Sequence, residues 1–158
     1  MADTKTPTKR GSPKGKAKLF SDEERAAAQE TVRERKRTAA RHSPEEQRAG
    51  GAADIEAKIA EMSEADQAIA RRIHQIVQEV APGFMPRTFY GMPAYARDGK
   101  VVCFFQAKSK FKVRYSTFGF QPDAKIDDGE MWPVAFAVTK LTPRAEARIT
   151  ELVKKAAG

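Results

Sequence analysis

The sequence has a single cysteine, Cys103, among its 158 residues. One cysteine excludes a disulfide within the chain and a cluster of thiolate metal ligands. Chains without disulfides are typical of a reducing compartment, so we expect a cytoplasmic protein. Long apolar runs are also missing: VVCFF at 101–105 is far shorter than the ~20 residues of a membrane span, so we expect no membrane partner.

Recognisable catalytic motifs are missing as well. The sequence contains no phosphate-binding glycine loop, no dinucleotide-binding fingerprint and no zinc-ligand spacing. His42 and His74 are not part of a recognisable triad pattern with Ser, Asp or Cys, so no catalytic triad can be argued. Cys103 lies between Val102 and Phe104, as an inert core thiol does. We therefore expect a protein without enzymatic activity.

Positive charge, in contrast, is abundant. The formal net charge is +8, and residues 1–50 carry 13 Lys and Arg against 8 Asp and Glu. A basic excess of this kind permits contact with polyanions, so nucleic-acid association through residues 1–41 is one hypothesis. The alternative interpretation is a solubilising N-terminal segment that needs no partner.

The N-terminal third divides into a tail and a helix. Residues 1–20 are rich in Lys, Pro, Gly, Ser and Thr, which predicts a disordered basic tail. Ser21 and Glu24 form a capping-box pattern at the start of a helix over 21–41. This helix has few large apolar residues, so we expect it to be solvent-exposed and at most loosely docked.

The dipeptide Gly50-Gly51 predicts a boundary between a helical extension at 21–50 and a domain at 51–158. Helical periodicity dominates the first part of this domain. The apolar positions form two stripes, the second behind the capping residue Ser63: Ile55, Ile59 and Met62, then Ile69, Ile73, Ile76, Val77 and Val80.

Strand patterns follow. Asp98-Gly99 is a strong hairpin signal, and 101–106 is apolar on both faces, as a central strand is. Residues 110–116 alternate, which predicts a strand with Phe111, Val113 and Tyr115 on one side and Lys110, Lys112 and Arg114 on the other. Residues 121–130 read as a loop, and 134–138 alternates again.

A last helix begins at Thr142 and Pro143, as N-cap and first helical residue. This order of elements predicts an α+β fold, in which a mainly antiparallel sheet is flanked by N- and C-terminal helices. The large side chains of 110–116 and 134–138 should then meet the helices. The opposite face should hold a shallow basic trough of Lys110, Lys112 and Arg114 beside Ala135 and Ala137.

Two motifs resemble a known family: FYGMPAYARDGKVVCFFQAKSKFKVRYSTFGF at 89–120 and IDDGEMWPVAFAVTKLT at 126–142. Their order and spacing resemble those of the YdhG-like family, bacterial domains of unknown function, over about residues 54–157. The resemblance implies a secretion-chaperone-like α+β fold. Some members are described as frataxin-like iron chaperones, so the resemblance also implies iron as an alternative to a protein without a cofactor.

The leading functional hypothesis is a binding module for a small anionic or aromatic ligand, or for a partner segment. Tyrosine rings offer flat faces and cations pair with anionic groups. For the alternative of iron, the carboxylates of one loop are the best supply of hard oxygen ligands. The predicted ligand-binding residues are Tyr90, Met92, Tyr95, Lys112, Arg114, Tyr115 and Trp132, and the predicted metal ligands are Asp123, Asp127, Asp128 and Glu130.

Overall fold

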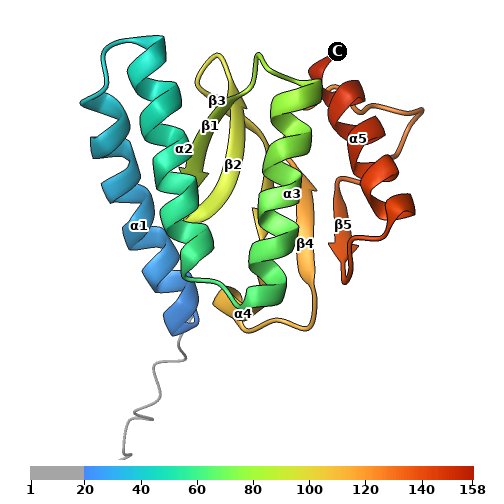
Figure 1. The fold of residues 1–158 in the computed structure, drawn as a ribbon, viewed down its shortest axis with the longest axis horizontal. Helices are drawn as coiled ribbons and strands as arrows, with labels where there is room; N and C mark the ends of the chain where they lie inside the picture. The colour runs from blue at the N-terminus through green and yellow to red at the C-terminus, as the bar shows by residue number, and fades with distance from the viewer. Residues whose placement is uncertain (1–19) are drawn as a thin grey trace, which may run out of the picture.

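The computed structural model describes residues 20–158, so nearly all of the predicted tail at 1–20 lies outside the described residues. Within them, five helices and five strands form an α+β fold, as predicted (Figure 1). Their order is α1 (Asp22–Ala39), α2 (Pro44–Ala60), α3 (Glu64–Val80), β1 (Met85–Phe89), β2 (Met92–Arg97), β3 (Lys100–Gln106), α4 (Lys108–Phe111), β4 (Ser116–Phe120), β5 (Ala135–Val138) and α5 (Pro143–Ala157).

The sheet is an antiparallel meander in which strand order follows chain order, with β3 at its centre. Two-residue turns join β1 to β2 and β2 to β3. Asp98 and Gly99 both have positive φ, at 52° and 78°, as the predicted hairpin turn requires. Tyr90 and Gly91 form a turn of the same kind, with φ of 51° and 74°. Gly91 therefore belongs to a second hairpin turn.

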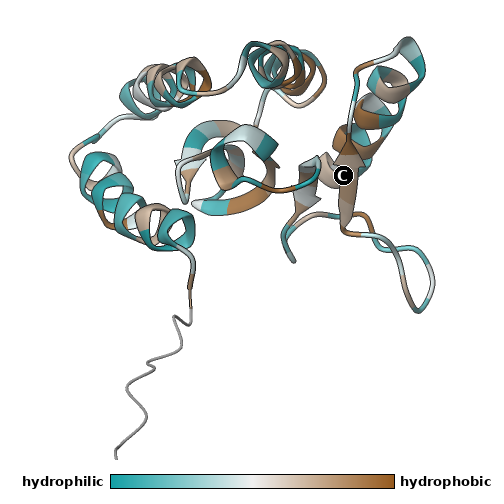
Figure 2. Ribbon diagram, turned by 90° about the horizontal axis from the view of Figure 1, so that it is seen from below, coloured by the Kyte–Doolittle hydropathy of each residue, from teal (hydrophilic) through white to brown (hydrophobic). Residues whose placement is uncertain are grey.

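Helices cover one face of this sheet. Figure 2 shows α2, α3 and α5 arranged around one side of it, with α1 beside the β1 end. Alternate residues of each strand point to this covered face, where Tyr95, Phe105 and Phe118 are fully buried. They pack with the predicted apolar stripes of α2 and α3, including Ile59 and Ile73, in one hydrophobic core. Cys103 is buried in the same core, as predicted.

The other face of the sheet, called the open face below, carries no helix among residues 20–158 except α1 at its margin (Figure 2). Ala94, Ala96 and Gly119 on this face are buried, but several larger or more peripheral strand residues are half-buried or exposed. They are Arg87, Phe89, Val101, Phe104, Thr117, Ala135 and Ala137.

Local helix signals are confirmed in the structure. The Ser21 hydroxyl accepts from the Glu24 amide at 3.1 Å, and the Glu24 carboxylate accepts from the Ser21 amide at 2.9 Å. Ser63 and Thr142 also cap their helices through side-chain oxygens. These interactions join residues three positions apart, which is why the sequence alone predicts them.

The predicted boundary at Gly50-Gly51 is wrong, because α2 continues through both residues. A Cβ atom at Gly51 would collide with the carbonyl oxygen of Pro86 in β1. The glycine therefore lets the helix lie directly against the strand backbone. A pattern that is typical of a linker serves close helix–strand packing here.

The predicted strand over 110–116 is also wrong. Residues 108–111 form the short helix α4, and β4 begins only at Ser116. The Asp66 carboxylate of α3, which is 1% exposed, accepts from the Ser109 amide at 3.0 Å and from the Ser116 hydroxyl at 3.0 Å. This carboxylate holds both ends of the segment in a compact turn, and such a distant contact outweighs the local alternation.

No helix within residues 20–158 combines the length and the apolar character that a membrane span requires.

Candidate functional site

The predicted ligand-binding residues do not converge on one site. Tyr95 and Met92 are buried, and the Tyr95 hydroxyl lies 3.0 Å from His74 Nδ1 under α3. Burial lowers the pKa of His74 and raises that of Tyr95, so both groups are neutral at pH 7. Trp132 packs against the core from the 121–134 loop. Of these residues, only Tyr90 lies beside the cleft described below.

The predicted basic trough is not formed. Ala135 and Ala137 are exposed on β5, as predicted, but they pair with Gly119 and Thr117 of β4 rather than lying beside cations. Lys112 follows α4, and its Nζ lies 2.7 Å from Glu23 Oε1 of α1. This hydrogen bond raises the pKa of Lys112 and lowers that of Glu23.

Arg114, another cation of the predicted trough, contacts Tyr115, which was predicted to lie on the opposite side of the strand. The Arg114 guanidinium lies over the ring of Tyr115, with 5.0 Å between Arg114 Cζ and the ring centroid. Lys110 points elsewhere, to the carbonyl oxygen of Gly91, where its Nζ donates at 2.8 Å. The trough is not formed because residues 110–116, which should carry its cations, do not form a strand.

The four predicted metal ligands are not brought together as one set. Across residues 20–158, no three His, Cys, Asp or Glu side chains come close enough together to hold a metal ion. Asp123 instead pairs with Lys100 of β3, with 3.7 Å between Oδ1 and Nζ. Asp127, Asp128 and Glu130 are exposed on the 121–134 loop.

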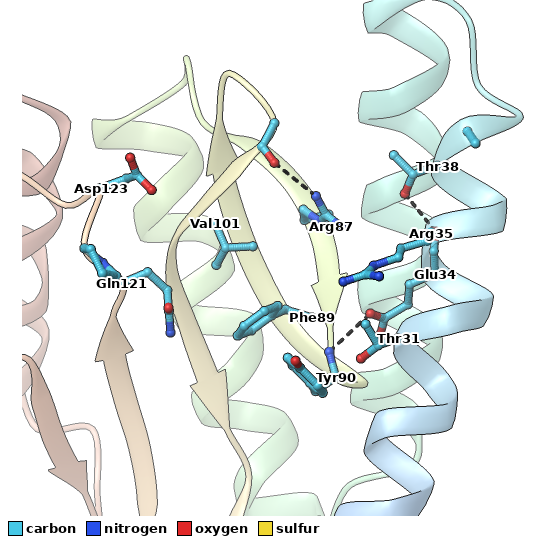
Figure 3. Close-up of a pocket in the computed structure, with 13 residues that line it drawn as sticks. Thr31, Glu34, Arg35, Thr38, Arg87, Phe89, Tyr90, Val101, Gln121 and Asp123 are labelled. Atoms are coloured by element: carbon cyan, nitrogen blue, oxygen red, sulfur yellow. Dashed lines mark hydrogen bonds between the residues drawn. The ribbon is translucent and has the colours of Figure 1, made fainter.

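The structure places a different candidate site between α1 and the open face of the sheet. A cleft of about 580 Å³, called the α1–sheet cleft below, is bounded by the described residues of α1, of β1 and β3, and of the segment after β4 (Figure 3). Phe89 and Val101 line it from the sheet, and Gln121 and Asp123 line its far side. Arg35 lines it from α1.

Glu34 holds the wall of this cleft in place. Its carboxylate is 3% exposed and accepts from the Gly91 amide at 2.7 Å and from the Tyr90 amide at 3.2 Å. α1 is therefore docked onto the β1–β2 turn, and the predicted loose or absent docking is wrong. A buried carboxylate that receives two amide hydrogen bonds fixes a helix even where few apolar residues are available.

An ion-pair cluster also ties α1 to α2. Glu30 of α1 lies 3.3 Å from Lys58 Nζ of α2, and Asp54 of α2 lies 2.7 Å from Arg41 Nη2. Arg37 reaches both carboxylates, at 3.2 Å from Glu30 and 3.6 Å from Asp54. These contacts bury little apolar surface, so a search for hydrophobic periodicity does not detect them.

Two guanidinium groups give the α1–sheet cleft its positive charge. Figure 3 shows Arg35 extending from α1 toward β1, where Arg87 lies. Arg35 is exposed and forms no ion pair or side-chain hydrogen bond with any residue in 20–158. Within the described part of the chain, the Arg87 side chain makes only long hydrogen bonds, at 3.4 Å to the Thr88 carbonyl and 3.5 Å to the Gly99 carbonyl. Both groups therefore retain hydrogen-bonding capacity.

Aromatic rings form the base of the cleft. The rings of Phe89 and Tyr90 meet edge to face with centroids 4.7 Å apart, and Phe89 lies 5.9 Å from Phe104. A Cβ atom at Gly119 would collide with the Phe104 ring, so glycine at 119 lets this ring lie flat against β4. The arrangement offers apolar ring surface beside two cations.

Comparison of the chain with family models, with curated proteins and with solved structures returns no match.

Proposed function

We propose that this chain is a non-enzymatic binding module that holds a small anion with a flat apolar body in the α1–sheet cleft. Arg35 and Arg87 would receive the anionic group, and Phe89 and Tyr90 would contact the apolar body. We also propose that the chain is a YdhG-like domain that works in the cytoplasm, on the strength of its motifs and its single cysteine.

The observation that carries this proposal is Arg35. An exposed arginine without a carboxylate partner contributes little to stability, because its charge remains solvated. A guanidinium is well suited to bind carboxylate or phosphate through two parallel hydrogen bonds. Phe89 and Tyr90 line the same cleft, which supports an anion that is also flat and apolar.

The size of the cleft supports a small-molecule ligand. Its volume of about 580 Å³ falls within the range of about 300–1,000 Å³ that is typical of such sites. The cleft is lined by few charged groups, and Asp123, the acidic group on its far side, is paired with Lys100. Glu34 also lines the cleft, but its carboxylate is 3% exposed and accepts from two backbone amides, so Arg35 and Arg87 are the charged groups that retain hydrogen-bonding capacity for an anion.

The positions of Cys103 and His74 support binding rather than catalysis. Cys103 is fully buried, and burial raises the pKa of its thiol well above the ordinary value. His74 lies on α3, on the covered face, with its Nδ1 engaged by Tyr95. Neither group lines the α1–sheet cleft.

The proposal can be tested with a fluorescent aromatic anion, anilinonaphthalene sulfonate, titrated into the full chain. We expect saturable binding that weakens roughly tenfold or more in Arg35→Gln/Arg87→Gln, since each lost charged hydrogen bond costs on the order of 1 kcal/mol or more. The uncharged N-phenylnaphthylamine should bind both proteins equally. Circular dichroism should show the same fold in each.

A matched control is available on the same helix. Arg25 and Lys36 are exposed, do not line the cleft and form no ion pair within residues 20–158. Arg25→Gln/Lys36→Gln removes the same charge and should leave binding of the anionic dye within a factor of about two. Equal weakening by both pairs would show that net charge, and not the cleft, attracts the dye.

Nucleic-acid association through residues 1–41 is the second candidate, supported by the exposed cations Arg25, Arg35 and Lys36 of α1. The same two variant pairs distinguish it. A single-stranded oligonucleotide held by its backbone should lose affinity in both pairs, and its binding should decrease steeply with added salt.

A further inference from the structure

A second cavity, of about 520 Å³, lies in the segment from the end of β4 to the start of β5 and is called the 120–134 cavity below. Its lining differs in character from that of the α1–sheet cleft. The wall is mostly apolar and the charged lining residues are acidic; the main contributors are Phe120, Ile126, Met131 and Trp132, with Asp127 and Glu130.

The wall of this cavity is anchored to the core. The Phe120 amide donates to the Val134 carbonyl at 2.7 Å, which closes the two ends of the loop. The Lys125 amide donates to the Ala156 carbonyl of α5 at 3.3 Å, and the Ile126 side chain is buried. The cavity is therefore preorganised by the fold, which lowers the entropic cost of binding.

Large apolar side chains remain exposed at this cavity. Met131 is 88% exposed and Val134 is 50% exposed, although both lie beside the core residue Trp132. Methionine is flexible and polarisable, and it adapts well to varied apolar partners. Exposed apolar surface rimmed by polar groups is typical of an interaction site.

The acidic residues at the rim of the cavity favour a cationic partner. Asp127 and Glu130 are exposed and form no ion pair with any residue in 20–158. Among residues 20–158, no basic residue lines the cavity. In a chain of net charge +8, this local acidic rim attracts cations and repels anionic ligands and anionic lipid headgroups.

We propose that the 120–134 cavity docks a short segment of a partner protein that carries Lys or Arg beside a large apolar side chain. The apolar side chain enters between Trp132 and Met131, and the cationic groups pair with Asp127 and Glu130. This proposal is independent of the anion site. The α1–sheet cleft and the 120–134 cavity share only Gln121 and Pro122, and they attract opposite charges.

The chain contains its own reporter, because Trp132 is its only tryptophan and lines the cavity. The probe is a peptide of sequence KLKFK, blocked at both ends, titrated into the full chain while Trp132 emission is recorded. We expect a saturable change in emission that decreases with added salt. The peptide ELEFE, with the same apolar residues and opposite charge, should cause none.

Two double variants that remove the same charge test whether the peptide binds at the 120–134 cavity. Asp127→Asn/Glu130→Gln should weaken KLKFK binding roughly tenfold, the expected effect of two exposed ion pairs. Asp128→Asn/Glu45→Gln removes the same charge from exposed residues outside the cavity, and it should change binding by less than about twofold. Met131→Ser should also weaken binding, with unchanged thermal stability because Met131 is exposed.

Three results would overturn the proposal. The first is no saturable response at millimolar peptide, and the second is equal weakening by both variant pairs. The third is a change of Trp132 emission when the protein concentration is raised without peptide. If Asp127→Asn/Glu130→Gln abolished that change, the occupant would be a second copy of this chain. Loss of dye binding at Arg35 and Arg87 would leave the proposal intact.

Discussion

The two faces of the sheet are built from the same strands and differ in what lies against them. On β3, Phe105 points to the covered face and is fully buried, whereas its neighbour Phe104 points to the open face and is half-buried. The covered face is closed by α2, α3 and α5. Among the helices of residues 20–158, only α1 borders the open face, and it is held there by Glu34 and by ion pairs.

The side chains of the two faces therefore differ in how much they contribute to the stability of the fold. On the covered face, apolar side chains pack against one another and polar side chains have polar partners. Tyr95 lies within hydrogen-bonding distance of His74, and Asp66 accepts from Ser109 and Ser116. At the open face, apolar rings and two guanidinium groups remain accessible. The core under the covered face stabilises the chain, and the proposed ligand site lies on the open face.

The largest loss of stability is expected from a cavity in the core under the covered face. Phe105→Ala should lower the free energy of unfolding by about 4 kcal/mol, because it leaves a cavity in the core. Phe104→Ala should cost only about 1–2 kcal/mol, because its ring is half-exposed. Urea denaturation of the two variants compares the faces directly, and equal losses would contradict the distinction between them.

A second large effect is expected at Asp66. Asp66→Ala should lower the free energy of unfolding by about 3 kcal/mol, because Ser109 and Ser116 lose a charged acceptor. Glu64→Ala, an exposed acidic residue of the same helix, should stay within about 0.5 kcal/mol. A similar loss in both variants would mean that the helix dipole, rather than the buried hydrogen bonds, is responsible.

The contribution of Asp66 to stability should also depend on pH, which urea denaturation at acid pH can measure. Burial alone would raise the pKa of Asp66, but the hydrogen bonds from Ser109 and Ser116 lower it below 3.8. The stability that Asp66 contributes is therefore present above about pH 3.8, and it decreases as the pH falls through the lowered pKa.

The smallest effect is expected at His74, again on the covered face. Burial lowers the pKa of folded His74 below 6.5, so the unfolded chain takes up a proton first. Stability should therefore be greatest above about pH 6.5 and should decrease as the pH falls through the folded pKa. Urea denaturation at pH 7.5 and pH 5.5 measures this difference. It should shrink in His74→Gln and persist in the exposed control His42→Gln; persistence in both would contradict the assignment.

Prediction from sequence succeeded where the determinants are local. Capping residues, helical stripes and the Asp98-Gly99 turn act within a few positions, so the α+β order of elements could be predicted. The segment 110–116 could not, because its conformation depends on Asp66, which lies far away in the sequence. Gly51 was misread for the same reason, since only the contact with Pro86 explains it.

The candidate site escaped prediction because its cations come from separate segments. Arg35 lies in a helix that seemed merely solvated, and Arg87 lies in a strand before the aromatic motif. Only Tyr90 connects the predicted site with the α1–sheet cleft. The docking of this helix depends on the burial of Glu34, which its local sequence pattern does not reveal.

Chemical-shift mapping by NMR tests the central claim most directly, because it shows where an aromatic anion binds. On addition of anilinonaphthalene sulfonate, the backbone amides of Arg35, Tyr90 and Val101 should shift together and saturate. The Trp132 indole and the amides of α5 should stay unchanged. Largest shifts in the 120–134 cavity, or small shifts spread over the whole chain, would contradict an anion site on the open face of the sheet.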